Sequence, residues 1–412
     1  MKKFIPAVAL LAAAFAGSTA VRAADVEVAH WWTSGGEQAA VSVFANEFDA
    51  LGGDKWIDGA IAGGEASRSA TLQRILGGNP PGAAQFNPGR QYEELIANGQ
   101  LLDLTDLATK ENWAGLIRPQ SISEACLVDG HWWCVPVNIH SWNWAWASIP
   151  AFKAAGVELP TSFADFLEKA PKLKAAGITP FAIGGESWQI SGAFGVVQTS
   201  MLGLEKREQI LKGKDVALAA AEMPAVFTKW REFKQYTDEG SANRNWNDTT
   251  NLVITGKAAM QIMGDWARGE FAVAGQKAGV DYACLALPIE APTVSTGGDI
   301  FLFPKNSDPA VEAAQLKMAS MMITPRVQAL FNNAKGSMPV RDDVDMSLAD
   351  DCMKKGLEII KDEKNIAVDA GRWLSNDTTG QMNDLAAKFW ADDSMTVEDA
   401  VAQYVDILKN AD

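Results

Sequence analysis

Strand-like and helix-like segments alternate along most of this 412-residue chain, and no internal repeat or Pro/Gly/Ser-rich linker interrupts them. Alternation of this kind predicts an α/β fold, because strands joined by helices assemble into sheets whose faces the helices cover. The chain is longer than a single hydrophobic core usually covers, so we expect two lobes. Since no linker separates them, we expect the chain to cross between the lobes several times.

Residues 1–23 have the three parts of a secretory signal peptide. Lys2 and Lys3 come first, an apolar stretch follows, and the small residues Val21 and Ala23 predict cleavage after Ala23. The apolar stretch is too short to span a bilayer, and no nearby cysteine could carry a lipid. The sequence therefore predicts a periplasmic protein whose signal peptide is removed and which has no lipid anchor.

The formal net charge of the whole chain is −15, with 51 acidic and 36 basic residues. Such a charge disfavours nucleic acid and anionic membrane surfaces as partners. Thr255-Gly256-Lys257 lacks the leading glycine of a P-loop, and the chain has no Gly-x-Ser-x-Gly nucleophile motif. We therefore expect no cofactor.

The four cysteines all follow the signal peptide, so an oxidising compartment is expected. Cys126 and Cys134 bracket an Asp-Gly dipeptide, which is a hairpin turn signal, and this predicts a disulfide across the hairpin. Cys284 and Cys352 then remain as the second pair. A zinc site is the competing interpretation, but neither the cysteine spacing nor the three histidines match a ligand pattern, so no metal site is expected.

Two adjacent tryptophans, Trp31 and Trp32, follow a predicted strand over Asp25–His30 and precede an amphipathic helix. They therefore lie at the carboxyl end of a strand, where α/β proteins bind ligands. Each exposed indole there would leave ~150–250 Å² uncovered unless a flat, partly apolar group such as a sugar ring packs on it. The alternative is two core indoles beside a capping box, with Ser34 as N-cap and Glu37 three residues later.

Local patterns predict further elements. Gln315–Phe331 is predicted to be one long helix, and Asp265 to be the N-cap of a helix that follows a buried strand. Trp142, Trp144 and Trp146 alternate at strand spacing, which predicts that the three indoles pack on one face.

Seven signals follow one another in a specific order. They are the signal peptide, Trp31-Trp32 with Glu37, Leu76-Gly77-Gly78-Asn79-Pro80-Pro81 with Gln85-Phe86-Asn87, Val135-Pro136-Val137-Asn138-Ile139-His140, Gly256-Lys257-Ala258-Ala259-Met260 with Met263-Gly264-Asp265-Trp266, Asp299 before Phe303-Pro304-Lys305, and Lys335-Gly336-Ser337. In this order they closely resemble the extracytoplasmic sugar-binding proteins of ABC importers, specifically the glucose-binding branch. The resemblance covers essentially all of the mature chain.

This resemblance implies a two-lobe periplasmic-binding-protein fold, type II-like, with a hinged ligand cleft. It assigns residues 24–137 and 295–338 to the N-terminal lobe, and residues 138–294 and 339–412 to the C-terminal lobe. By analogy, the chain crosses between the lobes near Val137–His140, Thr293–Gly297 and Ser337–Arg341.

The resemblance also implies which residues bind the sugar. Trp31 and Trp32 match the stacking pair of the family, and Trp246 and Trp266 match indoles that the second lobe contributes. The residues that match polar or charged contacts to hydroxyl groups are Glu37, Gln85, Asn87, Asp299 and Lys335. Four further residues are candidates for the cleft: His140, Trp188, Trp373 and Asn376.

Two positions depart from the glucose-binding relatives. Asn87 stands where the relatives carry a histidine, and the segment 367–379 contains no second histidine. Trp373, Asn376 or Asp377 is expected to replace the second contact. The shorter asparagine leaves more room than a histidine, so we expect weaker discrimination among sugars.

These observations predict a monomeric binding protein that captures a monosaccharide, an aldohexose with glucose as the leading candidate, and delivers it to the permease subunits of an ABC importer. Two alternatives remain open: a binding protein for another small polar solute, such as an oligosaccharide, polyol or osmolyte, and a secreted glycosidase with two carboxylates. No local signature pairs an acid with a base, so no enzyme activity is expected. A quaternary amine fits poorly because Lys335 would repel it.

Overall fold

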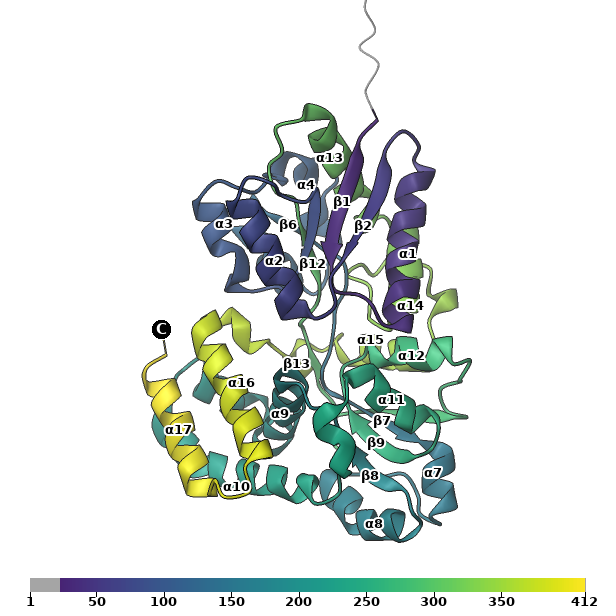
Figure 1. The fold of residues 1–412 in the computed structure, drawn as a ribbon, viewed down its shortest axis with the longest axis vertical. Helices are drawn as coiled ribbons and strands as arrows, with labels where there is room; N and C mark the ends of the chain where they lie inside the picture. Colours follow the sequence, from purple (N-terminus) through teal and green to yellow (C-terminus); the bar gives the residue numbers. More distant parts are fainter. Residues whose placement is uncertain (1–22, 412) are drawn as a thin grey trace, which may run out of the picture.

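The computed structural model describes residues 23–411, which form two lobes, one above the other in Figure 1. The upper, N-terminal lobe contains a five-stranded sheet in the order β2 (Lys55–Ala60), β1 (Asp25–His30), β3 (Ala83–Phe86), β12 (Ile300–Leu302) and β6 (Cys134–Pro136). The lower, C-terminal lobe contains a four-stranded sheet in the order β10 (Tyr282–Ala286), β7 (Trp144–Ser148), β9 (Ala258–Ile262) and β8 (Thr179–Ala182). The predicted two-lobe α/β fold is confirmed. Residues 1–22 of the predicted signal peptide lie outside the described part of the chain.

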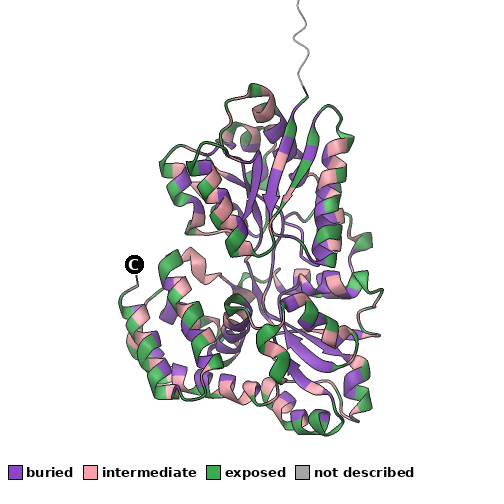
Figure 2. Ribbon diagram, viewed as in Figure 1, coloured by how far each residue is buried: buried purple, intermediate pink, exposed green. Residues whose placement is uncertain are grey.

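One hydrophobic core surrounds the sheet of the N-terminal lobe and continues into the C-terminal lobe at Trp146 and Phe271. Most strands of both sheets are mainly purple in Figure 2, because helices and loops bury them, whereas the edge strand β2 is largely green. The core of this lobe contains the large side chains of Trp32, Phe44, Phe86, Phe301 and Phe331. The helices that pack on the sheet or on each other are α1 (Gly35–Ala50), α2 (Gly64–Leu76), α13 (Pro309–Ile323) and α14 (Pro325–Lys335).

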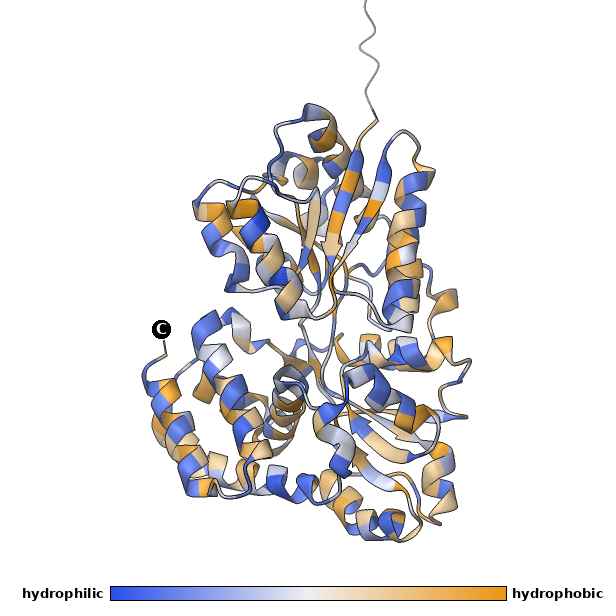
Figure 3. Cartoon of the chain, viewed as in Figure 1, coloured by the Kyte–Doolittle hydropathy of each residue, from blue (hydrophilic) through white to orange (hydrophobic). Residues whose placement is uncertain are grey.

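The C-terminal lobe has a second core, which contains Phe181, Phe227, Trp230 and Phe389. Its helices include α8 (Phe163–Ala175), α9 (Ser187–Leu211), α10 (Val216–Lys234), α11 (Trp246–Ile254), α12 (Ala267–Val273), α16 (Asn376–Ala391) and α17 (Val397–Lys409). Figure 3 shows blue and orange residues alternating along helices such as α17, as expected for helices that bury only one side. No helix within residues 23–411 has the length and apolar content needed to cross a membrane.

Three segments connect the lobes, and they hydrogen-bond to one another. His140 N donates to Gly297 O at 3.0 Å, and Ile139 and Met338 exchange two N–H···O bonds of 2.8 and 3.1 Å. Each segment passes from one lobe to the other at the place where these hydrogen bonds form. The three crossings expected from the sequence therefore lie side by side and form one narrow ribbon between the lobes.

The prediction of one long helix over Gln315–Phe331 is wrong, because α13 and α14 are separate helices. They meet at Thr324, whose φ of −62° and ψ of 147° are extended. Pro325 disfavours the helical conformation at the residue before it, and its fixed φ suits the first turn of a new helix. Apolar residues continue at helical spacing on both sides of Thr324, so periodicity alone did not reveal the break between the two helices.

The predicted hairpin between Cys126 and Cys134 is confirmed. Asp129 and Gly130 occupy its turn with φ values of 52° and 82°, as a two-residue type I′ turn requires. Two short antiparallel strands flank the turn. The predicted disulfide closes the hairpin, with its Cα atoms 5.1 Å apart.

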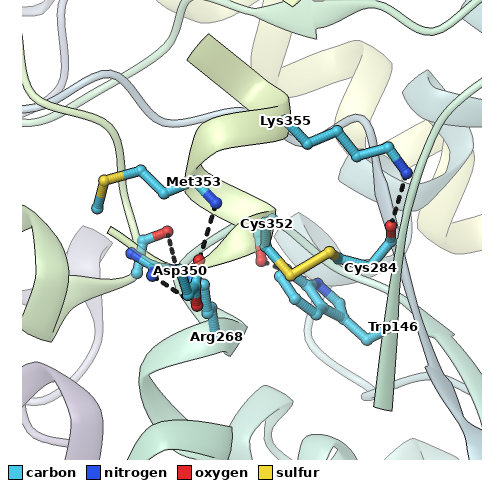
Figure 4. Close-up of a disulfide and its surroundings, with 9 residues drawn as sticks. Trp146, Arg268, Cys284, Asp350, Cys352, Met353 and Lys355 are labelled. Atoms are coloured by element: carbon cyan, nitrogen blue, oxygen red, sulfur yellow. Dashed lines mark hydrogen bonds and ion pairs between the residues drawn. A yellow bond between two sulfur atoms is a disulfide. The ribbon is translucent and has the colours of Figure 1, made fainter. Parts of the chain in front are cut away.

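The second predicted disulfide, Cys284–Cys352, is also present, and Figure 4 shows it between β10 and α15 (Asp351–Ile359). Two polar contacts flank the bridge. Lys355 Nζ donates to Cys284 O at 3.1 Å, and Arg268 Nη1 pairs with Asp350 Oδ2 at 2.8 Å. The disulfide therefore anchors the segment after the third crossing to the sheet of the C-terminal lobe.

The two disulfides are expected to stabilise the fold unequally. Cys126 and Cys134 are 8 positions apart, whereas Cys284 and Cys352 are 68 positions apart. Under a chain-entropy model, losing the bridge that closes the longer loop lowers the free energy of unfolding by about 2 kcal/mol more. Denaturant titration of the two Cys→Ser double variants measures both losses. Equal losses, or a larger loss for the shorter loop, would contradict this expectation.

Candidate functional site

A cavity of about 850 Å³ lies between the lobes, and residues from both lobes line it. Of the residues that the sequence analysis nominated, eleven line this cavity: Trp31, Trp32, Glu37, Asn87, His140, Trp188, Trp246, Trp266, Asp299, Lys335 and Asn376. Gln85 lies just behind the lining and contacts two of these residues. Trp373 is not part of the lining, because its ring lies against Arg207 and Lys212 instead.

The adjacent indoles Trp31 and Trp32 have different environments. Trp32 is 1% exposed and packs against Phe44, Phe301 and Phe331 in the core, although it also borders the cavity. Trp31 is only partly buried, and the guanidinium of Arg68 lies 5.2 Å from its ring centroid. The core interpretation is therefore correct for Trp32, whereas Trp31 is available to a ligand.

The capping box predicted beside these indoles is confirmed. Ser34 Oγ accepts a hydrogen bond from Glu37 N, and Glu37 Oε2 accepts hydrogen bonds from the backbone N–H groups of Thr33 and Ser34 at 3.2 Å. The other carboxylate oxygen, Glu37 Oε1, lies 3.7 Å from Lys335 Nζ. The Glu37 carboxylate therefore caps the N-terminus of α1 with one oxygen and lies near the cavity with the other.

Lys335 stands at the C-terminal end of α14, where Gly336 adopts a φ of 89° and closes the helix. Its side chain is 2% exposed. Besides the Glu37 contact, Lys335 Nζ lies 5.7 Å from the ring centroid of Trp32 and 6.0 Å from that of Trp266. Within residues 23–411, this ammonium group has no acceptor at hydrogen-bond distance, so its N–H groups are available to a ligand.

The C-terminal lobe contributes a cluster of aromatic rings around Trp266. The centroids of Trp142, His140 and Trp188 lie 4.9, 5.0 and 6.3 Å from that of Trp266. Trp188 is 37% exposed, and its Nε1 donates to Glu186 Oε2 at 2.6 Å. Trp246 lies deeper, at the first turn of α11.

The prediction that three alternating tryptophans pack on one face is wrong for Trp142. Trp144 and Trp146 do stack, with centroids 6.1 Å apart. However, β7 begins only at Trp144, and Trp142 N donates to Ser295 Oγ at 2.7 Å outside the strand. Because Trp142 precedes the first residue of the strand, the alternation of strand side chains does not apply to it. Its ring lines the cavity instead.

Asp299 is buried at the base of the cavity and accepts several hydrogen bonds. Gln85 Nε2 donates to its Oδ1 at 2.7 Å, Asn138 Nδ2 donates to its Oδ2 at 2.8 Å, and His140 Nε2 lies 3.1 Å from Oδ2. Burial would raise the pKa of Asp299, but His140, the charge of Lys335 and the Asn138 amide together lower it. Asp299 is therefore held as a carboxylate in one fixed orientation.

His140 joins Asp299 to a second carboxylate. Its Nδ1 lies 2.5 Å from Asp265 Oδ1. Burial would lower the pKa of His140, but the charge of Asp265 and the hydrogen bonds of both carboxylates raise it, against the opposing charge of Lys335. The protonated imidazole can donate to both carboxylates at once.

Asp265 is not the N-cap of α12, so that prediction is wrong. Its two oxygens contact His140 Nδ1 and the backbone N–H of Ser141. Trp266 occupies the N-cap position and makes no side-chain cap bond. The Asp265 carboxylate therefore bonds to two buried groups, the His140 imidazole and the Ser141 N–H, instead of capping the helix.

Two amide side chains fix the geometry of the N-terminal wall. Gln85 Oε1 accepts from Trp31 N at 3.0 Å, so Gln85 connects Trp31 to Asp299. Asn87 Oδ1 accepts from Arg68 Nη1 at 3.1 Å, and Asn87 Nδ2 donates to Gly298 O at 3.0 Å.

The sequence analysis missed Arg68, which lies on α2 and lines the cavity. Burial lowers its pKa, and the charges of Glu65 and Asp299 partly oppose this effect. Its helix has no motif that distinguishes this arginine from a solvated one, so the sequence carried no signal for it.

The cavity combines aromatic rings with charged side chains. Within residues 23–411, no group of three histidine, cysteine or acidic side chains is placed to hold a metal. Indole rings from both lobes can cover apolar faces, while a fixed carboxylate and an ammonium group can bond to hydroxyl groups.

Comparison with known proteins agrees with this chemistry. The model of the bacterial extracellular solute-binding protein family matches residues 15–329. A probable sugar-binding periplasmic protein of Rhizobium meliloti (strain 1021) is 36% identical over 360 residues, which are 87% of this chain and 86% of the relative. An ABC transporter extracellular-binding protein of Pyrococcus horikoshii is 31% identical over 329 residues, 77% of this chain and 72% of the relative.

Among solved structures, the bacterial solute receptor AcbH, described as having an exclusive preference for β-D-galactopyranose, matches with a TM-score of 0.78. It is 18% identical and covers 94% of this chain and 98% of its own, a likeness that shows the fold. The relatives are named as binding proteins and not as enzymes, in agreement with the expectation from the sequence. The chain therefore belongs to the family of bacterial extracellular solute-binding proteins, and it is a sugar-binding periplasmic protein of an ABC importer.

Proposed function

We propose that this protein captures an aldohexose as a monosaccharide, with glucose as the leading candidate, and delivers it to the permease subunits of its importer. The observation that carries this proposal is the convergence of Trp31, Trp266, Asp299 and Lys335 on one cavity between the lobes. We also propose that the mature protein is a monomer, cut after Ala23 and free of lipid.

The chemistry of a pyranose supports this assignment. Its C–H faces are apolar, and its hydroxyl groups form a belt around the ring edge, so it needs aromatic plates and polar rim groups together. Trp31 and Trp266 come from different lobes and would cover the ring when the lobes close. Asp299 can accept from one hydroxyl group and Lys335 can donate to a neighbouring one. Each such charge-assisted bond contributes roughly 1.5–3 kcal/mol.

We propose that the two lobes close on each other. The N-terminal lobe consists of residues 24–137 and 295–338, and the C-terminal lobe of residues 138–294 and 339–412. The only covalent links between these lobes would be the three crossing segments, which bond to one another near Ile139. Motion about this ribbon would open or close the cavity, and the close packing of α1 against α12 would limit the direction of that motion.

Removing one aromatic plate or the ammonium group is expected to weaken sugar binding. Trp266→Ala and Lys335→Met should each raise the Kd for glucose at least about tenfold, because one stacking surface or one charge-assisted bond is lost. Calorimetric titration measures this change. Trp373→Ala is the matched control, since its indole does not line the cavity. A wild-type Kd for Trp266→Ala or Lys335→Met would remove that residue from the proposed site.

The site is expected to discriminate only moderately among monosaccharides. The Asn87 amide already bonds to Arg68 and to Gly298, so it has fewer unpaired donors and acceptors for a ligand hydroxyl group than a free histidine would have. At least one of mannose, galactose or xylose should bind within ~2 kcal/mol of glucose, roughly thirtyfold in affinity. Titration with the four sugars tests this, and a preference for glucose above roughly a thousandfold over all three would be the opposite outcome.

Glucose affinity is expected to depend on the protonation of His140. Below its raised pKa, the imidazolium donates to both Asp265 and Asp299; as the pH rises through this pKa, one donor is lost. Its Nε2 then becomes an acceptor 3.1 Å from Asp299 Oδ2, and only in this state can it accept from Asn138 Nδ2 at 3.2 Å. Affinity, and the stability contributed by this contact, should therefore decrease as the pH rises.

Titrations with glucose from roughly pH 6 to roughly pH 9 check this dependence, since they span the ordinary histidine pKa and values well above it. The control is His140→Gln, which should bind more weakly and without the same pH profile. A wild-type Kd that stays constant across this range, or a profile that the variant retains, would show that His140 does not act through its charge.

A further inference from the structure

Arg268 is a buried charged side chain that lies outside the cavity. It stands in the first turn of α12, two positions after Trp266, and it is 3% exposed. It is not among the residues that line the cavity, so it does not contact a sugar there. A buried guanidinium is costly to desolvate unless its N–H groups are bonded, so its partners indicate its role.

Most partners of Arg268 come from the end of α14. Its Nε donates to Gly336 O at 3.2 Å, and its Nη2 donates to Asn332 O at 3.1 Å and lies 3.5 Å from Ser337 O. The last carbonyl groups of a helix have no acceptor role within that helix, and a cation beside them also interacts favourably with the helix dipole. Arg268 of the C-terminal lobe therefore caps a helix of the N-terminal lobe.

The fourth contact of Arg268 fixes its guanidinium in the C-terminal lobe. Arg268 Nη1 pairs with Asp350 Oδ2 at 2.8 Å, a contact that Figure 4 shows. Asp350 is itself held, because its Oδ1 accepts from Met353 N at 2.9 Å and caps α15. The Cys284–Cys352 disulfide connects α15 to β10. The guanidinium thus has little freedom to move away from the end of α14.

The end of α14 and the start of α12 also touch through their backbones. A Cβ atom on Gly336 would lie 2.6 Å from Asp265 O. A Cβ atom on Gly269 would lie 3.0 Å from Ala334 O. Neither glycine could carry a side chain unless the backbone moved. The two helix ends therefore form one tightly packed unit, and the hydrogen bonds of Arg268 cross it.

Lys335 is the last residue of this helix end, and it lies between the carbonyl groups that Arg268 bonds. Its Nζ is 3.7 Å from Glu37 Oε1 and 6.0 Å from the ring centroid of Trp266. No hydrogen bond of its own fixes this ammonium group within residues 23–411. Its position therefore depends on how the backbone at the end of α14 is held.

We propose that Arg268 is a positioning residue for Lys335. By holding the end of α14 against α12, it keeps Lys335 Nζ and the Trp266 indole at one spacing. A sugar then meets a donor and an aromatic plate that are already placed relative to each other, which lowers the entropic cost of binding. This part of the site is assembled before the lobes close. The inference rests on the proposed function, because it requires Lys335 to bond to the sugar.

A double-mutant cycle tests whether Arg268 acts through Lys335. Wild type, Arg268→Met, Lys335→Met and the double variant are titrated with glucose by calorimetry. Arg268→Met should raise the Kd at least about fivefold when Lys335 is present, because the ammonium group is less well placed for its charge-assisted bond. In the Lys335→Met background, the same change should raise the Kd less than about twofold. A merely structural effect would be equal in both backgrounds.

Asp350→Asn is a milder second variant, which decides the question if Arg268→Met does not fold. It removes the charge that holds the guanidinium but keeps an oxygen for the α15 cap, and neither Asp350 nor Arg268 lines the cavity. The Kd for glucose should rise at least about twofold, and again only while Lys335 is present.

Arg231→Met is the matched control. Arg231 Nη2 donates to Phe389 O at 3.3 Å and to Met395 O at 3.0 Å near the end of α16, and its Nη1 pairs with Asp393. It therefore bonds a helix end as Arg268 does, but it does not line the cavity or contact Lys335. The control should lower the free energy of unfolding and keep the wild-type Kd for glucose.

The possible failures are distinguishable. If the Arg268→Met and Asp350→Asn variants keep the wild-type Kd, or weaken binding equally in both backgrounds, the positioning inference is wrong and the proposed function stands. If Lys335→Met has no effect, the inference fails together with that site assignment. If wild type binds mannose, galactose or xylose but not glucose, the glucose proposal is wrong and the same cycle with that sugar decides the inference. Binding of none of these sugars would overturn both.

Discussion

The contact of one imidazole with two carboxylates organises the centre of this molecule. His140 lies on a crossing segment, Asp265 precedes a helix of the C-terminal lobe, and Asp299 precedes a strand of the N-terminal lobe. Two buried carboxylates near one another would repel and would be costly to desolvate, whereas a shared imidazolium compensates both charges. Since Asp299 and Trp266 both contact this imidazole, the same residue that joins the lobes also positions two walls of the cavity.

A second polar contact joins α1 of the N-terminal lobe to α12 of the C-terminal lobe. Gly36 N, at the start of α1, donates to Glu270 Oε1 of α12 at 2.8 Å, as expected for a carboxylate at a helix N-terminus. The backbones meet so closely that a Cβ on Gly36 would lie 2.7 Å from Gly269 C. Together with the His140 contacts, this interface restricts how the lobes can rotate, because neither glycine position has room for a side chain.

The sequence predicted the architecture better than it predicted the individual contacts. Strand alternation and the Asp-Gly turn depend on local chemistry, so the strand Asp25–His30 and the Cys126–Cys134 disulfide could be predicted directly. The second disulfide, between cysteines 68 positions apart, followed only because two cysteines remained. The errors at Asp265 and Trp142 arise where a partner more than a hundred positions away decides the outcome. Arg68 had no local signature at all, since its environment depends on Trp31 and Asn87 across the sheet.

The structural and functional interpretations of a residue proved compatible rather than exclusive. Glu37 caps a helix with one oxygen and faces Lys335 with the other, and Trp32 packs in the core while it also borders the cavity. A group that is already fixed for structural reasons loses little further conformational entropy when a ligand binds. Placing the polar rim on a helix cap and a helix end therefore lowers the entropic cost of binding. By the same argument Asp299, whose oxygens are held by Gln85, Asn138 and His140, would lose less conformational entropy on accepting from a ligand hydroxyl group than a mobile surface carboxylate would.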